Sequence, residues 1–374
     1  MKGKRILFVA NTAWSMHNFR MGLMKTLLRN GYVVLVAAPY DAYSDKITEH
    51  GIEVISLKKL QASGANPFRE WAFYDELLAI YKRHKPDLIF HYTIKPNIYG
   101  VLAAKRLKIP TIAVTTGLGY VFTNQNLVSL AGRWLYRYSL PKADSVWFLN
   151  QEDLATFRKH IGLPQQKMLL LPGEGIDTGT FSRESAIDFT QTVFIFTGRM
   201  LYEKGVEILV SSVKQLKEKG YTFTCLLLGF LDIENPSAIP REKLERWQQE
   251  GLITYLGSTD NVRPYLEKAN CFVFPSYYSE GIPKSLLEAA SMEIPIITTD
   301  NVGCRDVVEH GKTGFIAEPR SVASLTEKME QFLNLPMNEK LQMGILSRKK
   351  VDTAFGEGHV IAIYLRSIAA VLKK

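Results

Sequence analysis

The sequence has 374 residues, of which 46% are hydrophobic and 22% are charged, with a formal net charge of +9. This composition is typical of a folded globular protein and excludes a disordered chain, and no apolar run reaches the ~18 residues that a membrane-spanning helix needs. Three well-separated cysteines, Cys225, Cys271 and Cys304, argue against a disulfide framework or a zinc site, so a reducing cytoplasm is the expected location.

The first half of the chain alternates between predicted strands and predicted helices. Short runs rich in Val and Ile predict strands at 5–10, 32–38, 52–57, 87–92, 111–116 and 144–150. They are apolar nearly throughout, as parallel strands covered on both faces are. Helix-length segments lie between them at 18–30, 67–84, 95–107 and 126–140. The alternation predicts an α/β fold with an open, doubly wound parallel sheet.

A second α/β domain is predicted after a polar, Gly- and Thr-rich linker at about 172–190. Its strands are expected at 193–198, 224–229, 253–257, 271–275 and 294–299, and the segment 360–372 has helical periodicity. The predicted boundaries are 1–175 for the N-terminal domain, 190–355 for the C-terminal domain, and 356–374 for a final helix that packs on one sheet or bridges the two domains. Ligands of such folds bind outside the carboxyl ends of the strands.

The segment 271–299 is the richest in chemically informative residues. A buried strand is predicted to end at Pro275, and a helix is predicted to begin near Pro283 or Lys284. Ser279 or Glu280 would satisfy backbone donors there, and Gly281 lets the chain approach a ligand closely. The unpaired N–H groups at a helix N-terminus favour an anion such as a diphosphate.

Two glutamates in this segment are candidate sugar ligands. Glu288 would lie about one turn into the helix, within reach of a ribose, and Glu280 lies in the preceding loop near a sugar hydroxyl. Their spacing is uninformative alone, because Glu242 and Glu250 have the same spacing in what is expected to be a solvated helix. The position directly after a buried strand is what favours function.

A second candidate element runs from Gly198 to Gly205. A strand is predicted to end at Gly198, Arg199 follows it, and Lys204 and Gly205 precede a helix. Cations at the carboxyl end of a strand are well placed to neutralise a diphosphate. The same residues are also compatible with an ordinary strand-to-helix turn whose charged side chains are solvated.

Together these residues resemble the donor-binding half of glycosyltransferase family 4, the retaining group with the GT-B fold of two facing Rossmann-like domains. The matching motifs are G-R-M-x-x-x-K-G at 198–205, P-S-x-x-x-E-G-x-P-x-x-x-L-E at 275–288 and V-G-C-R-D-V-V-E-H-G-K-T-G-F at 302–315. The resemblance implies catalytic roles for Arg199, Lys204 and Glu280, with the two cations on the donor diphosphate and Glu280 on the transferred sugar. It implies that the other donor ligands are Glu288 on the ribose, Gly257 near the uracil ring, and Gly198, Gly281, Ile282 and Lys284.

The N-terminal half is similar to bacterial family members that extend glycans on undecaprenyl diphosphate. The resemblance rests on HYTIKPNIYG at 91–100 and TTGLGYVFT at 115–123. It implies acceptor-binding residues at His91, Thr93, Lys95, Gly117 and Gly119. Asn18 and Arg20 of the first strand's loop are further acceptor-binding candidates, because they could enter the cleft. His91 is equally compatible with a structural role in a buried strand. The first loop lacks the Gly-Gly pair of many members, so that role is not transferred to Asn18 or Arg20.

By this resemblance the reaction is a retaining transfer from a UDP-sugar, with substrate-assisted attack on the face that UDP leaves. Arg199, Lys204 and the helix start near Lys284 would stabilise the charge on the departing diphosphate. The chain contains no D-x-D sequence, so no metal and no other cofactor is expected. N-acetylhexosamine or hexose is the expected sugar, and capsule, O-antigen or glycan assembly is the expected process.

The charge of the two halves differs. Residues 1–175 contain 23 Lys and Arg against 12 Asp and Glu, a net +11, whereas residues 176–374 contain 23 against 25, a net −2. A lipid-linked acceptor at an anionic inner leaflet would explain the basic half, and the expected location is cytoplasmic and peripheral to the membrane. The segments 104–108 and 132–142 mix basic, aromatic and aliphatic residues as peripheral membrane helices do. They are also compatible with ordinary covered helices.

Three alternatives remain open from the sequence. A UDP-sugar epimerase on the same fold would need no acceptor, and a phosphorylase would need a lysine carrying pyridoxal phosphate. A basic nucleic-acid-binding protein is a non-enzyme alternative, but the chain has no recognition-helix, zinc-finger or RNP-type pattern, so no nucleic-acid partner is expected.

Overall fold

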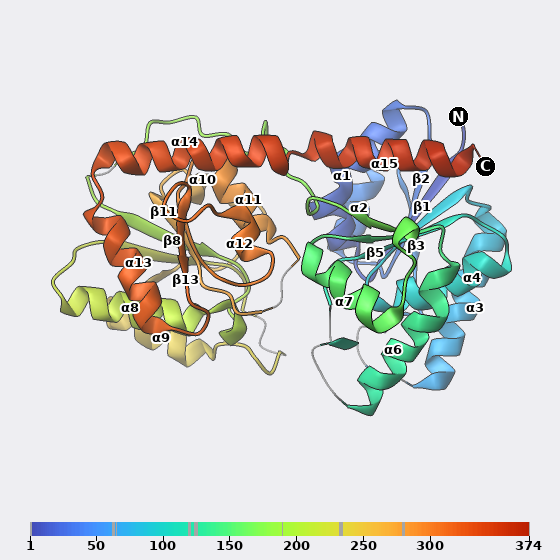
Figure 1. The fold of residues 1–374 in the computed structure, drawn as a ribbon, viewed down its shortest axis with the longest axis horizontal. Coiled ribbons are helices and arrows are strands. Elements are labelled where there is room, and N and C mark those ends of the chain that lie inside the picture. Colours follow the sequence, from blue (N-terminus) through green and yellow to red (C-terminus); the bar gives the residue numbers. More distant parts are fainter. Residues whose placement is uncertain are drawn as a thin grey trace. The chain divides into compact units, whose positions relative to one another are not determined.

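The computed structural model describes residues 2–61, 64, 66–118, 121–122, 126–188, 190–231, 235–278 and 281–373. The chain forms two compact units (Figure 1). Unit 1 comprises Met1–Glu174 and Glu357–Lys374, and unit 2 comprises Gly175–Gly356, so the chain crosses between the units after Glu174 and again after Gly356. Within the described ranges, none of the helices combines the length and the apolar character needed to cross a bilayer.

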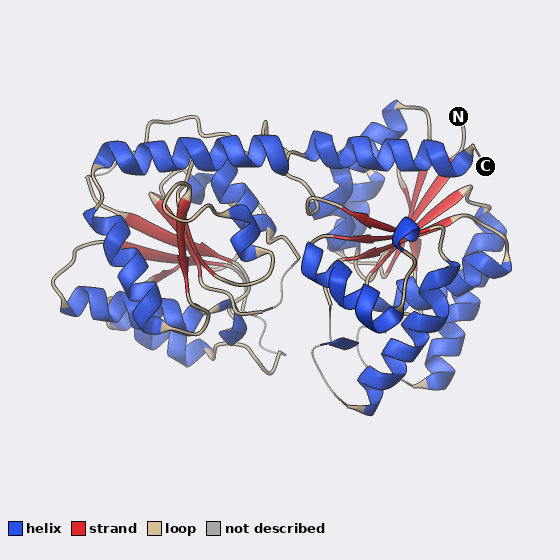
Figure 2. Ribbon diagram, viewed as in Figure 1, coloured by secondary structure: helices blue, strands red, loops and turns tan. Residues whose placement is uncertain are grey.

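Unit 1 is built around a seven-stranded parallel sheet with the order β3-β2-β1-β4-β5-β6-β7 (Figure 2). In chain order its elements are β1 (Arg5–Val9), α1 (Ala13–Arg29), β2 (Val33–Ala38), α2 (Ala42–Thr48), β3 (Glu53–Ser56), α3 (Pro67–His84), β4 (Leu88–Tyr92), the π-helix η1 (Pro96–Gly100), α4 (Val101–Arg106), β5 (Thr111–Thr115), α6 (Leu127–Ser139), the 3-10 helix η2 (Leu140–Lys142), β6 (Ser145–Phe148), α7 (Gln151–Ile161), the 3-10 helix η3 (Gln165–Lys167), β7 (Met168–Leu170) and α15 (Glu357–Leu372).

Helices cover both faces of this sheet, which is why its strands are apolar at consecutive positions. In β1, Ile6 and Phe8 face the core formed with α1, α2 and α15. Leu7 and Val9 face the opposite core, formed with α3 and α4. The side chains alternate between faces as a strand requires, and all four are fully buried.

The C-terminal helix α15 is part of unit 1. The Tyr364 ring lies 4.7 Å from the Trp147 ring and 5.1 Å from the Phe90 ring, measured between centroids. The Tyr364 hydroxyl is 2.9 Å from that of Tyr92. These contacts bury aromatic surface of β4 and β6, so the last segment of the chain completes the core of the first domain.

Unit 2 is built around a six-stranded parallel sheet with the order β10-β9-β8-β11-β12-β13 (Figure 2). Its elements are β8 (Val193–Thr197), the 3-10 helix η4 (Tyr202–Lys204), α8 (Val206–Glu218), β9 (Thr224–Leu228), α9 (Arg241–Gln249), β10 (Thr254–Tyr255), α10 (Arg263–Leu266), β11 (Cys271–Phe274), α11 (Lys284–Ser291), β12 (Ile296–Thr299), α12 (Cys304–Val307), β13 (Gly314–Ala317), α13 (Val322–Asn334) and α14 (Met337–Ala354).

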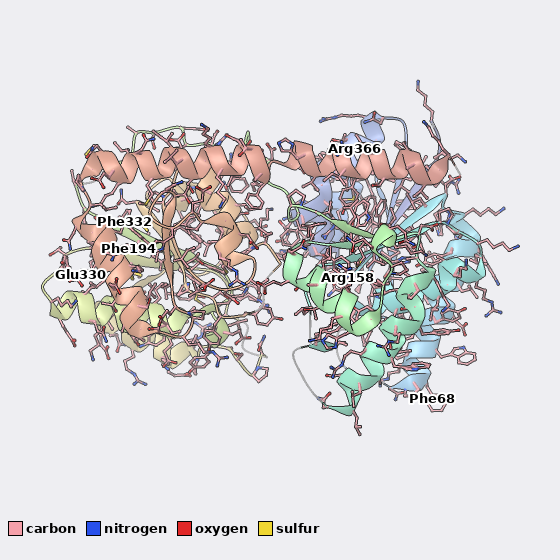
Figure 3. The ribbon with its side chains drawn as sticks, viewed as in Figure 1. Phe68, Arg158, Phe194, Glu330, Phe332 and Arg366 are labelled. Atoms are coloured by element: carbon pink, nitrogen blue, oxygen red, sulfur yellow. The ribbon has the colours of Figure 1, made fainter. Side chains whose placement is uncertain are left out.

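The core of unit 2 is one continuous hydrophobic cluster. Phe194 of β8 and Phe332 of α13 meet within it, with ring centroids 5.9 Å apart (Figure 3). Arg348 of α14 donates hydrogen bonds to the backbone oxygens of Thr178, Phe181 and Ser291. The polar segment before β8 has no helix or strand at Thr178 and Phe181. Hydrogen bonds from the Arg348 guanidinium to its backbone oxygens hold it to the unit instead.

The predicted pair of parallel α/β sheets is confirmed. The structure adds two edge strands, β7 and β13, and the helices α2, α7, α10, α12, α13 and α14, which the apolar pattern did not predict. It also divides the predicted helix at 95–107 into η1 and α4. Pro283, expected in the first helical turn, is the N-cap of α11. β7 has three residues, β13 four and α2 seven, and such short segments do not show a recognisable apolar periodicity.

The loop after β8 packs directly on the loop after β11. Gly205, at φ +78°, lies so close to Pro275 that an added Cβ would be 2.1 Å from the Pro275 carbonyl oxygen. The backbone oxygen of Glu203 accepts hydrogen bonds from the N–H groups of Tyr277 (3.0 Å) and Tyr278 (3.2 Å). Two of the sequence motifs are therefore joined by their backbones.

We predict that Gly205→Ala lowers the free energy of unfolding by about 2–4 kcal/mol, since the variant adds left-handed strain and a clash with a backbone carbonyl. Gly251→Ala is the matched control, because Gly251 has φ +68° and nothing within 4 Å of an added Cβ, so it carries only the strain of about 1 kcal/mol. Urea unfolding of both full-length variants measures the difference. Equal losses would contradict the role of the Gly205 contact.

Candidate functional site

Three neighbouring strands of unit 2 end in glycines at the same edge of the sheet. Gly198 follows β8, Gly229 follows β9 and Gly257 lies beyond β10. The Gly229 N–H donates to the Gly257 oxygen at 2.7 Å, and an added Cβ on Gly229 would lie 1.7 Å from the Gly198 oxygen. The carboxyl edge of these strands is therefore a strip of bare backbone, which a flat or extended ligand can approach closely.

Two predicted cations border this strip. Arg199 follows Gly198 directly and is half-buried. Lys204 ends η4, and its Nζ lies 5.4 Å from the ring centroids of both Phe274 and Tyr278. The ammonium group thus stands beside the loop after β11, where aromatic faces favour a cation. Both positive charges are on the edge of the sheet that binds ligands in open α/β folds.

The third sequence motif reaches the same loop through Asn301, which lies between β12 and α12. Its side-chain amide donates to the backbone oxygens of Ser276 and Tyr278. The Thr299 hydroxyl also donates to the Ser276 oxygen. Asn301 was not among the predicted site residues, although it immediately precedes the motif at 302–315. Its role is to fix the backbone of the loop after β11.

Helix α11 begins at Lys284 and carries Glu288 one turn later. Lys284 Nζ lies 3.7 Å from Glu288 Oε1. Burial raises the pKa of the Glu288 carboxyl, and the neighbouring Lys284 charge opposes that rise. Gly281 and Ile282 lie directly before the helix, and the Ile282 side chain is buried. Ser279 and Glu280 lie outside the described residues.

The α1 candidates of unit 1 differ in exposure. The Asn18 side-chain amide donates to the Trp14 oxygen at 3.0 Å. Arg20 is buried; it forms an ion pair with Glu174, and its guanidinium lies 3.9 Å from the Tyr92 ring centroid. Burial disfavours this guanidinium, but Glu174 and the tyrosines hold the pKa of Arg20 above its usual value. Glu174 was not predicted; its place between Gly173 and Gly175 is the only local signal.

His91 has the structural role that the sequence left open. It is fully buried in β4, with Nε2 2.8 Å from the Tyr81 hydroxyl and Nδ1 2.7 Å from the Thr111 hydroxyl. Burial lowers its pKa to about 3, so the ring is neutral at physiological pH. An added Cβ on Gly100 would lie 2.2 Å from the ring. Both nitrogens are engaged, one by Tyr81 of α3 and the other by Thr111 of β5, which leaves the ring no access to an acceptor.

The remaining candidates of unit 1 lie beyond the carboxyl ends of β4 and β5. Thr93 has the unusual φ of +69°, and its oxygen accepts a hydrogen bond from the Asn97 N–H. Lys95 Nζ lies 2.6 Å from Glu70 Oε1 of α3. Gly117 follows β5, with open space where a Cβ would be. Gly119 lies outside the described residues.

Glu70 is a functional candidate that the sequence did not indicate. It holds Lys95, and its position is set by the packing of α3 on η1. Burial, together with Glu70, raises the pKa of Tyr99 on η1. The structure thus brings the donor candidates that it describes to one sheet edge of unit 2, and Thr93, Lys95 and Gly117 to the corresponding edge of unit 1. Among the described residues, no group of His, Cys, Asp and Glu side chains is arranged to hold a metal ion.

Comparison with known proteins identifies the family on both halves of the chain. The model of Glycosyl transferases group 1 matches residues 177–350, and that of Glycosyl transferase 4-like matches residues 5–150. The chain is similar to the N,N'-diacetylbacillosaminyl-diphospho-undecaprenol alpha-1,3-N-acetylgalactosaminyltransferase of Campylobacter jejuni, with 30% identity over 387 residues and 99% coverage of both chains.

Two further matches extend this result. The UDP-Gal:alpha-D-GlcNAc-diphosphoundecaprenol alpha-1,3-galactosyltransferase of Escherichia coli is 22% identical over 74% of this chain and 76% of its own length. The structure of a glycosyltransferase from Rickettsia africae superposes with a TM-score of 0.83, at 16% identity, over 100% of both chains. The expected GT-B fold is confirmed. With the sequence match to the Campylobacter enzyme, these findings establish that the chain belongs to glycosyltransferase family 4 and is a glycosyltransferase.

Proposed function

We propose that this enzyme transfers an N-acetylhexosamine or hexose, with retention, from a UDP-sugar to a sugar on a lipid diphosphate in bacterial surface polysaccharide or glycan assembly. The Campylobacter relative, which matches over 99% of both chains, is named for transfer of N-acetylgalactosamine to a diphospho-undecaprenol-linked sugar. The Escherichia coli relative is named for a UDP-sugar donor and an acceptor of the same kind. No observation favours the epimerase alternative.

The observation that carries the proposal is the carboxyl edge of the unit 2 sheet. Bare backbone at Gly198 and Gly257 adjoins two cations, and α11 begins beside the loop that Lys204 borders. A nucleoside diphosphate needs a flat surface for its base and positive charge for its phosphates. Lys and Arg side chains and the N–H groups of a helix N-terminus supply that charge.

The proposed donor roles are those that the family resemblance implies for these residues. Arg199 and Lys204 hold the diphosphate, Gly257 lies near the uracil, and Glu288 accepts hydrogen bonds from the ribose. Backbone groups at Gly281, Ile282 and Lys284 contact the sugar and phosphates, and Glu280 contacts the transferred sugar. When the glycosidic bond breaks, negative charge grows on UDP, and preorganised cations stabilise that charge most in the transition state. The acceptor hydroxyl attacks from the face that UDP leaves, and the proposal needs no metal or other cofactor.

The acceptor is proposed to lie against the carboxyl edge of the unit 1 sheet. Thr93, Lys95 and Gly117 follow adjacent strands there, and Asn18 and Arg20 belong to the helix after β1. Gly119, two residues after Gly117 in the sequence, is proposed to bind the acceptor with them. Glu70 holds the Lys95 ammonium in place, and the Glu174 ion pair holds Arg20. These two cations are therefore ordered before any ligand arrives. A lipid-linked acceptor also implies that the enzyme works at the cytoplasmic face of the membrane.

The function is tested by measuring UDP release from a panel of UDP-N-acetylhexosamines and UDP-hexoses, with and without an undecaprenyl-diphosphate-linked sugar. We expect release with one donor class and only when the acceptor is present, with the anomeric configuration retained in the product by NMR. Isomerisation of the donor without acceptor would instead establish an epimerase. An inverted product would contradict the retaining mechanism.

We predict that Arg199→Ala lowers kcat/KM. The loss of transition-state stabilisation should be about 2–4 kcal/mol, the usual cost of removing one preorganised group that stabilises a developing charge. Lys219→Ala is the control: this cation is 51% exposed and follows the C-terminal end of α8, whereas Lys204 precedes the N-terminal end of that helix. Steady-state kinetics of both variants with the identified donor measure the effect. Near-wild-type kinetics for Arg199→Ala would contradict the assignment of Arg199 to the donor diphosphate.

We predict that Glu288→Gln raises the Kd for UDP about tenfold to a hundredfold, because the variant loses hydrogen bonds to a charged acceptor, worth about 1.5–3 kcal/mol. Glu242→Gln on the solvated face of α9 is the control and should bind UDP as the wild type does. Calorimetric titration with UDP measures binding separately from turnover. An unchanged Kd for Glu288→Gln would contradict its assignment to the ribose.

A further inference from the structure

Helix α6 of unit 1 has a second apolar face that the fold does not cover. Its inner face is buried through Ser129, Tyr136 and Ser139. A different set, spaced by three and four residues, lies along the outer face of the helix. These residues are Leu127 (83% exposed), Leu130 (54%), Trp134 (65%) and Tyr138 (52%).

The start of helix α3 extends this surface. Phe68 is 86% exposed and Trp71 is 70% exposed, and Phe68 projects from the end of unit 1 (Figure 3). Both α3 and α6 pack on η1, so they belong to the same part of the unit. We refer to Phe68, Trp71 and the four outer residues of α6 as the aromatic patch. Monomeric proteins rarely leave so many large apolar side chains in water unless they bind something.

The α6 part of this patch lies in a stretch of chain that carries only positive charge, whereas α3 also carries Glu70, Asp75 and Glu76. Residues 88–143 contain seven Lys and Arg and no Asp or Glu. On α6, Arg133 and Arg137 flank the outer face, and Lys142 follows the helix with its Nζ 3.5 Å from the Tyr138 ring centroid. The surface therefore combines exposed Trp and Tyr rings with a basic flank, and an anionic bilayer presents the complementary charge.

Each of these features suits a lipid headgroup layer. Trp and Tyr concentrate at the membrane interface, because their rings are apolar at one end and polar at the other. An amphipathic helix lies in that layer with its apolar face down, and each nearby Lys or Arg adds about 1 kcal/mol of attraction to anionic lipid. A protein partner would also cover the exposed apolar side chains. It would not explain why residues 88–143, which include α6, contain no Asp or Glu.

We propose that the aromatic patch of α3 and α6 docks the enzyme on anionic bilayers, with Leu130 and Trp134 of α6 entering the headgroup layer. The inference deepens the proposed function, since it rests on a lipid-linked acceptor for its purpose. Docking by this surface requires no turnover, so it can be measured independently of the reaction.

The test is co-sedimentation of the full chain with vesicles of phosphatidylcholine alone or mixed with phosphatidylglycerol. We expect the wild type to prefer the anionic vesicles, and the double variant Leu130→Ser/Trp134→Ser to partition about tenfold more weakly, since it loses two apolar side chains from the interface. The control Met337→Ser/Ile345→Ser removes two exposed apolar side chains of α14 in unit 2 and should bind as the wild type does.

A second pair of variants isolates the charge. Arg137→Gln/Lys142→Gln should lose most of the preference for phosphatidylglycerol, whereas Lys219→Gln/Lys312→Gln, which neutralises two exposed lysines of unit 2, should keep it. Equal partition of the wild type onto neutral and anionic vesicles would overturn the assignment to anionic lipid. Circular dichroism melting of every variant verifies that each one is folded.

Turnover separates this inference from the proposed function. With an acceptor on a short, water-soluble lipid, Leu130→Ser/Trp134→Ser should react as the wild type does, and with an acceptor in anionic vesicles it should react more slowly. Vesicle binding that depends on the patch in an enzyme without transferase activity would support docking and overturn the function. Docking by the aromatic patch would be overturned if Leu130→Ser/Trp134→Ser bound vesicles as the wild type does. It would also be overturned if the double variant lost self-association on size-exclusion chromatography and kept its vesicle binding.

Discussion

The close approach of Gly205 to the Pro275 carbonyl oxygen is the contact on which the site of unit 2 depends. It lets the loop after β8 lie against the loop after β11, where the Glu203 oxygen accepts hydrogen bonds from two successive N–H groups. Lys204 is thereby carried to the Tyr278 ring. Any side chain at position 205 would separate the two loops, because the opposing atom is backbone and cannot rotate away.

Charged groups serve different purposes in the two units. In unit 1, Arg20 and Lys95 are held by Glu174 and Glu70. A buried cation is tolerated only with such a partner, because the loss of hydration otherwise outweighs every other gain. In unit 2, Arg199 and Lys204 border bare backbone at the sheet edge. Their proposed role is to hold the negative charge of the donor diphosphate.

The positive charge on the surface of unit 1 is concentrated in one stretch of the chain. Residues 88–143 supply the strands β4 and β5, the acceptor candidates Thr93, Lys95 and Gly117, and the basic helix α6. One stretch of chain therefore contributes both the inner edge of the sheet and the outer aromatic face. A uniform positive charge there costs little in the folded protein, because the basic residues are divided between α4, α6 and the turns near them and most of them face solvent.

The sequence by itself determined the two parallel sheets and the donor motifs, because both depend on local patterns. Buried parallel strands need consecutive apolar residues, and the turns that follow them need glycines such as Gly198 and Gly205. The tertiary structure alone decided which polar residues are held inside the fold. Arg20 meets Glu174 across 154 positions, and Lys95 meets Glu70 across 25. It also decided that His91 is structural and that one apolar face of α6 stays exposed. Pairing and burial depend on residues far apart in the chain, which no local pattern records.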